Sequence, residues 1–211
     1  MEEDLIKNST PVRKLYLLIY IVSSLVLIAM TIVSISLEEW FTYCYWNFGL
    51  TKASTTLSNS AFKNEETIAD VRKDACHGLK DEIQDECPHF CNFPTRLEVA
   101  GAFILFLTIV SVISQIFSLF YHVVRYRRID LRFGCIWFLI LLTFLLQFSG
   151  FLAYYFIGGF ISMDSVTDLE FQKDSPNDFT WKGGLILYTI VLCLQFALMI
   201  FGELFTRKGF K

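Results

Sequence analysis

The chain has 211 residues, 54% of them hydrophobic and 17% aromatic, with 22 phenylalanines and a net charge of −3. A soluble domain of this size could not bury that much apolar surface, whereas lipid can cover it. The composition therefore excludes a soluble globular protein. It indicates an integral membrane protein in which no polar stretch is long enough for a separate soluble domain.

Four apolar runs organise the chain as one four-helix membrane domain over residues 1–211. They cover residues 15–37, 97–122, 133–161 and 182–203. Each is close to or above the ~20 residues that a helix needs to cross the hydrocarbon core. The first run is too long for the apolar part of a cleavable signal peptide, so we expect it to remain as an anchor helix.

Basic residues predict the orientation of these helices, because Lys and Arg near short loops favour the cytoplasmic side. They gather before the first run, between the second and third, and after the fourth: Arg13, Lys14, Arg125, Arg127, Arg128, Arg132, Arg207, Lys208 and Lys211. We therefore expect both termini in the cytoplasm and the loops at 38–95 and 162–181 outside. The protein would be multi-pass, in the plasma membrane, with the basic clusters facing anionic lipid rather than nucleic acid.

The first outer loop carries signals of its own secondary structure. Aromatic residues 41–50 predict a strand with a hairpin partner further along, and the Ser/Thr-rich residues 51–60 predict a turn or loose connection. Apolar residues spaced by three and four within 65–86 predict an amphipathic helix. Four aromatic residues are expected at the outer membrane interface: Trp40, Tyr43, Tyr45 and Trp46.

Four of the six cysteines lie in this loop: Cys44, Cys76, Cys87 and Cys91. An oxidising compartment permits disulfides, and four cysteines allow three connectivities between which the sequence does not choose. His77 and His89 raise the alternative of a zinc site, but their spacing fits no standard ligand pattern. A thiol-redox enzyme would need Cys-x-x-Cys, whereas three residues separate Cys87 from Cys91. We therefore expect disulfides, no cofactor and no metal.

Strongly polar side chains within the apolar runs are few. Gln115, Gln147 and Gln195 are expected to form hydrogen bonds between helices. No charged residue lies near the middle of any run. Transporters and channels normally place ionisable groups there or line a hydrophilic path, so this pattern counts against transport by the chain alone.

Three short segments resemble the superfamily of claudins, peripheral myelin protein and epithelial membrane proteins. A Trp leaves the first helix and a Gly-Leu pair follows on a strand in that family, as Trp40, Gly49 and Leu50 do here. Residues 94–99 are similar to the segment that closes the loop, with Arg96 at the membrane surface. Residues 179–183 are similar to the aromatic and glycine segment before the fourth helix. Thr51 and Ser54 stand where the family has Trp and its first Cys.

The resemblance implies a four-transmembrane-helix bundle capped by a small extracellular β-sheet. Trp40, Gly49, Leu50 and Arg96 would fix the fold of the first outer loop, and Cys44, Cys76, Cys87 and Cys91 would brace it differently from the family's usual disulfide. This agrees with the expectation, drawn from the apolar runs, of a helical membrane protein with one elaborate loop.

The functions that this architecture allows are mainly non-enzymatic. The first is a lateral accessory subunit or membrane organiser that contacts other integral membrane proteins or further copies of itself. The alternative is a cell–cell junction protein, and a membrane thiol-redox enzyme comes third because it lacks a suitable motif. Junctional claudins commonly end in a motif that docks a scaffold, whereas residues 208–211 offer little for one. The tail therefore favours the accessory subunit or organiser.

Overall fold

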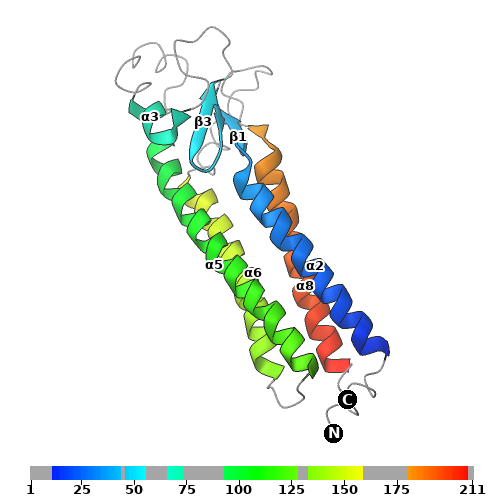
Figure 1. Cartoon of the computed structure of the whole chain (residues 1–211). Coiled ribbons are helices and arrows are strands. Elements are labelled where there is room, and N and C mark those ends of the chain that lie inside the picture. The colour runs from blue at the N-terminus through cyan, green and yellow to red at the C-terminus, as the bar shows by residue number, and fades with distance from the viewer. Residues whose placement is uncertain are drawn as a thin grey trace, which may run out of the picture.

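The structure is a computed structural model that describes residues 11–43, 46–55, 66–73, 93–127, 133–158 and 180–208. Four long helices lie side by side, and a small sheet covers one end of them (Figure 1). The helices are α2 (Pro11–Ser36), α5 (Phe93–Arg127), α6 (Phe133–Ile157) and α8 (Gly183–Lys208). The prediction of four helices that are long and apolar enough to cross a membrane is confirmed.

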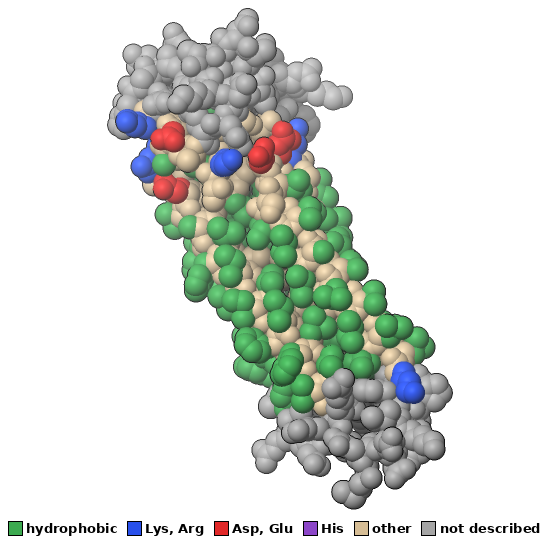
Figure 2. All heavy atoms as spheres, in the orientation of Figure 1, with side chains coloured by type: hydrophobic (Ala, Val, Ile, Leu, Met, Phe, Trp, Pro, Cys, Tyr) green, Lys and Arg blue, Asp and Glu red, His purple; other side chains and the backbone are tan. Residues whose placement is uncertain are grey.

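The apolar parts of these helices match the thickness of a bilayer. The candidate spans are Lys14–Ser36, Pro94–Val124, Trp137–Ile157 and Gly183–Gly202. The 21 residues of the third span rise about 30 Å, the thickness of the hydrocarbon core. Apolar side chains cover the outside of the helices in Figure 2, and the described charged side chains gather mainly at the sheet end. These features indicate a multi-pass membrane protein.

The helix ends differ from the predicted runs by a few residues. Helix α5 continues past His122 to Arg127, and α8 continues to Lys208, because charged residues end an apolar run without ending a helix. Helix α6 ends at Ile157, and residues 159–161 of the predicted run lie outside the described residues. Pro94 falls in the first turn of α5, where a missing backbone N–H costs no helical hydrogen bond.

The sheet has five antiparallel strands in the order β4-β3-β2-β1-β5. They are β1 (Phe41–Tyr43), β2 (Trp46–Phe48), β3 (Lys52–Thr55), β4 (Glu66–Thr67) and β5 (Thr180–Trp181). Strand β5 precedes α8 and pairs Phe41 with Trp181. The sheet therefore joins the segment after α2 to the segment before α8.

Two predictions for this region were wrong in detail. Residues 41–50 form two strands paired with each other, Phe41 with Phe48, rather than one long strand. Residues 52–55, predicted as a loose connection, form β3. Ala53 is buried in the apolar core, whereas Lys52 is exposed and Ser54 is half-buried. The polar composition of the segment therefore gave no signal of a strand. The predicted helix over residues 65–86 begins at Ile68 and is described to Lys73, as α3; residues 74–86 lie outside the described residues.

The aromatic residues predicted at the membrane interface are instead in the core. Trp40, Tyr43 and Trp46 are buried in a cluster that also contains residues of α5, α6 and α8, while Tyr45 lies outside the described residues. Each can pack there because the sheet lies directly on the helix ends. The exposed tryptophans of the described residues are Trp137 near the start of α6 and Trp181 before α8, at opposite ends of the apolar zone, where membrane proteins favour tryptophan.

Candidate functional site

Trp40 anchors the sheet to the helix bundle. Its side chain is completely buried, and its indole Nε1 donates a hydrogen bond to the carbonyl of Ser34 at 2.9 Å. Ser34 lies in the last turn of α2, where carbonyls have no helical partner, so the indole caps that helix. The ring lies 5.3 Å from that of Tyr154 on α6 and 5.5 Å from that of Tyr188 on α8. Trp40 thus links three helices at the base of the sheet.

Main-chain hydrogen bonds fix the backbone around Trp40 on both sides. Its N–H donates to the carbonyl of Phe48 at 2.7 Å, and its carbonyl accepts from the N–H of Lys182 at 2.9 Å. The N–H of Gly184 donates to the carbonyl of Glu39 at 3.0 Å. The start of the sheet and the start of α8 are therefore one hydrogen-bonded unit.

Glycines allow the sheet and the helices to approach this closely. A Cβ atom at Gly184 would lie 2.6 Å from the indole Nε1 of Trp40, and one at Gly101 would lie 3.2 Å from the carbonyl carbon of Leu50 and closer still to its oxygen. Cβ atoms essentially never come within 3.0 Å of another atom. Gly101 on α5 and Gly184 on α8 are therefore two points at which the bundle and the segments of the sheet end approach each other closely.

The Gly49–Leu50 pair forms the turn that meets Gly101. The N–H of Gly49 donates to the carbonyl of Lys52 at 2.8 Å, which closes the turn between β2 and β3. A Cβ atom at Gly49 would lie 2.6 Å from the carbonyl oxygen of Glu38, so this position also needs glycine. The side chain of Leu50 is buried in the same cluster as Trp40. The structure thus brings Trp40, Gly49 and Leu50 together at the base of the sheet.

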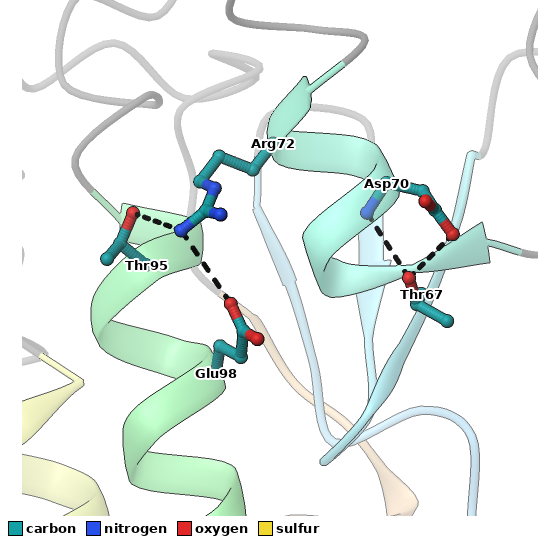
Figure 3. Close-up of polar contacts among 5 residues, drawn as sticks. All are labelled: Thr67, Asp70, Arg72, Thr95 and Glu98. Carbon is teal, nitrogen blue, oxygen red and sulfur yellow. Dashed lines mark hydrogen bonds and ion pairs between the residues drawn. The ribbon is translucent and has the colours of Figure 1, made fainter.

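Arg72 forms a second connection between the sheet end and α5 (Figure 3). Its Nη1 lies 3.3 Å from Thr95 Oγ1 and 3.7 Å from Glu98 Oε2. Arg96, which the resemblance placed at this position, is exposed on the same turn of α5. The described bond from the loop to α5 is therefore made by an arginine of α3.

Helix α3 is stabilised at its first turn by Thr67. The Thr67 hydroxyl donates to Asp70 Oδ2 at 2.6 Å and accepts from the Asp70 N–H at 3.2 Å, a reciprocal arrangement close to a capping box. Ile68 and Val71 of this helix have buried side chains. The cap and the two apolar side chains hold Arg72 in position over α5.

Tyr43 is the titratable side chain of this cluster outside the candidate spans. It lies on β1 and is buried together with Trp40. Burial raises the pKa of the Tyr43 phenol from its usual value of 10.0, because a phenolate is poorly solvated away from water. Tyr43 is therefore neutral at physiological pH.

The four cysteines predicted to form disulfides, Cys44, Cys76, Cys87 and Cys91, lie outside the described residues. Cys193 on α8 is a free, exposed cysteine. Within the described parts of the chain, no group of three or more His, Cys, Asp or Glu side chains is arranged to hold a metal ion.

Polar side chains follow the inside of α5 along the bundle. They recur every three or four residues and are all buried: Thr108, Ser111, Gln115, Ser118 and His122. This spacing places them on one stripe of the helix that faces the other helices. The outside of the same helix carries large apolar residues. Helix α5 therefore has its polar face inside the bundle, as expected of a helix surrounded by lipid.

This stripe is bonded to the other helices. Gln115 Nε2 donates to Gln195 Oε1 at 3.3 Å, and the hydroxyls of Tyr20 and Ser118 lie 2.7 Å apart. Tyr188 of α8 lies 2.9 Å from the Thr108 hydroxyl and donates to the backbone carbonyl of a residue on α6 at 3.3 Å. These bonds link α5 with α2 and α8, and α8 with α6, across the inside of the bundle.

Gln147 is the exception among the three glutamines. Its side chain is completely buried on α6, yet neither Nε2 nor Oε1 has a hydrogen-bond partner among the described residues. Gln115 Oε1 is likewise without a partner there. The predicted bond between helices is thus present for Gln115 with Gln195, but the side chain of Gln147 makes no such bond with a described residue.

Sequence reasoning did not single out Gly101 and Gly184, or the polar stripe of α5. The stripe had a readable signal, because its residues recur at a period of 3.5 within an apolar run. The glycines had none, because their role depends on contacts with Leu50 and Trp40, which are distant in the sequence.

Comparison with known proteins identifies no relative of this chain. No protein-family model matches the chain, and a search of curated proteins finds no significant match.

Proposed function

We propose that this chain is a non-enzymatic multi-pass membrane protein of claudin-like type that acts through protein–protein contacts. It would serve as a lateral accessory subunit or membrane organiser, in the plasma membrane, with both termini in the cytoplasm and the sheet outside. The observation that carries this proposal is the fixed position of the sheet. The turn between β2 and β3 contacts α5 at Gly101, and Trp40 and Glu39, which directly precede β1, contact α8 at Gly184. These contacts support a sheet and a bundle that act as one binding surface.

The inside of the bundle supports a binding role rather than transport. Buried polar side chains in the described spans are hydroxyls, amides and a single histidine, and several of them bond helix to helix. In lipid, where apolar contact between helices gains little, such bonds hold helices together. These bonded polar residues therefore have a structural use that accounts for their presence, whereas the side chain of Gln147 makes no such bond among the described residues.

The outside of the helices supports lateral contact. Large apolar side chains are exposed along α5, among them Phe106 and Phe120 with 62% and 66% exposure. These side chains lie against lipid or against the helices of a neighbouring membrane protein. A partner that packs on α5 would use this face without disturbing the polar interior.

The test is affinity purification of the tagged protein from its native membranes in mild detergent. The stoichiometry of whatever co-purifies is measured by mass spectrometry. A constant membrane-protein partner supports an accessory subunit, and self-association alone supports an organiser. Phe106→Ala with Phe120→Ala should weaken the lateral complex, while Lys52→Glu on the exposed part of the sheet serves as the matched control. Recovery of the chain as a monomer without partners, from membranes in which it is natively expressed, would contradict the proposal.

The alternative is a junction protein that contacts an opposing cell through the sheet. The observation that favours it is the position of the sheet at one end of the bundle (Figure 1). In a cell-aggregation assay, Lys52→Glu would then reduce contacts between cells and the Phe106→Ala, Phe120→Ala variant would not. The two functions therefore predict opposite responses from the same pair of variants.

A further inference from the structure

The buried glutamines Gln115 and Gln147 have three amide atoms without partners among the described residues: Gln115 Oε1, Gln147 Oε1 and Gln147 Nε2. Both side chains are almost completely buried. A buried amide atom that bonds to nothing is costly, and more so inside a membrane, so native structures normally supply a partner. These three atoms therefore point to a ligand that is itself able to donate and accept hydrogen bonds.

Helix direction brings the two amides toward the same level of the bundle. Thr143 of α6 bonds to Ser114 of α5 at 3.1 Å, so Gln147 lies one turn nearer the sheet than Gln115. The separation along the helix axis is about 7.5 Å, at 1.5 Å per residue. Long side chains lean toward the N-terminus of their own helix. Because α5 and α6 run in opposite directions, Gln115 leans toward the sheet and Gln147 leans away from it.

We propose that Gln115 and Gln147 bind a water molecule between α5 and α6. The water donates one hydrogen to Gln115 Oε1 and the other to Gln147 Oε1, and it accepts a hydrogen from Gln147 Nε2. Three bonds to otherwise unpaired groups are typical of a buried water. The site is uncharged, which matches a neutral ligand and not an ion.

Several polar groups near the two glutamines are already bonded and so do not compete for the water. The Thr143 hydroxyl bonds to Ser114 and to the carbonyl of Leu139, and the amide of Gln115 donates to Gln195. Tyr188 bonds to the backbone carbonyl of Gln147 and not to its side chain. Gln115 Nε2 also lies 3.5 Å from the backbone carbonyl of Ser24 on α2, and the Ser24 hydroxyl is a further buried atom without a partner among the described residues.

A double-mutant cycle tests whether one ligand joins these residues. Apparent Tm is measured in mild detergent for the wild type, Gln115→Leu, Gln147→Leu and the double variant. Two sites joined by a shared water give shifts that are not additive. Tyr20→Phe combined with Gln147→Leu is the control pair and should be additive, because Tyr20 bonds to Ser118 in a different layer. If the Leu variants do not fold, the cycle is repeated with Asn at both positions.

Nuclear magnetic resonance of the full chain in nanodiscs identifies the ligand. The side-chain NH₂ of Gln147, assigned by its loss in Gln147→Leu, should show a cross peak to water that survives a soluble paramagnetic agent. This cross peak together with non-additive Tm shifts is the expected result. Absence of the cross peak overturns the proposal, and a cross peak with additive shifts overturns the shared site.

Discussion

Gly101→Ala tests whether the sheet depends on close backbone contact with α5. The new Cβ would lie 3.2 Å from the carbonyl carbon of Leu50 and closer to its oxygen. Both atoms belong to the turn between β2 and β3, which is closed by the Gly49 to Lys52 hydrogen bond. The contact is with backbone, so no side chain can rotate away, and the turn or the helix must move.

Two opposing terms set the magnitude. Replacing glycine by alanine inside a helix normally stabilises it by about 1 kcal/mol. Overpacking a close contact costs about 1–3 kcal/mol, and the upper part of that range applies where backbone must shift. We therefore expect Gly101→Ala to destabilise the protein by about 1–2 kcal/mol, a fall of roughly 2–8 °C in apparent Tm for a chain of this size.

The assay is thermal unfolding in mild detergent, with Gly150→Ala as the matched control. Gly150 also lies inside a helix, α6, but a Cβ there would meet its nearest atoms, in Ile104 and Leu107, at an ordinary 3.4 Å. Gly150→Ala should leave apparent Tm unchanged or slightly higher. If Gly101→Ala is as stable as Gly150→Ala, the sheet does not depend on this contact and the reasoning is refuted.

Three further changes probe the sheet end. Trp40→Phe should lower stability by about 1–3 kcal/mol because the carbonyl of Ser34 loses its donor; an unchanged Tm would contradict this. Arg72→Gln should cost less than about 1 kcal/mol, since Arg72 and Glu98 are 43% and 50% exposed, and a larger fall in Tm would show a stronger coupling. Because the pKa of Tyr43 is raised in the folded protein, the unfolded chain loses its proton first, so stability should fall as pH rises above 10.0, less steeply in Tyr43→Phe. Equal pH slopes for wild type and variant would argue against burial of this phenol.

The parts of the fold that could be predicted are those that depend on composition alone. Each helix was evident from an apolar run, because lipid requires apolar side chains over the whole length of a span. A strand near Trp40 was evident from aromatic residues. The break between Tyr43 and Trp46, which makes a hairpin of residues 41–50, was missed because both halves have the same aromatic composition.

The parts that could not be predicted depend on which segments meet. Nothing in the sequence connects Gly101 with Leu50, or Arg72 with Thr95. The burial of Trp40 was missed for the same reason, because an aromatic side chain at the end of a span is equally suited to the membrane interface and to a core beneath a sheet.

The sheet and the bundle are best understood as one cooperative unit. Apolar surfaces alone do not hold helices together in lipid, so the polar stripe of α5 and the glycine contacts must supply much of the specificity. Strand β5 joins α8 to the sheet, and Trp40 caps α2 while packing on α6 and α8. A change at Gly101 or Gly184 should therefore loosen the sheet and the helix ends together. In that case a change that disturbs a binding surface on the sheet would also disturb one on the helices, and the reverse would hold as well.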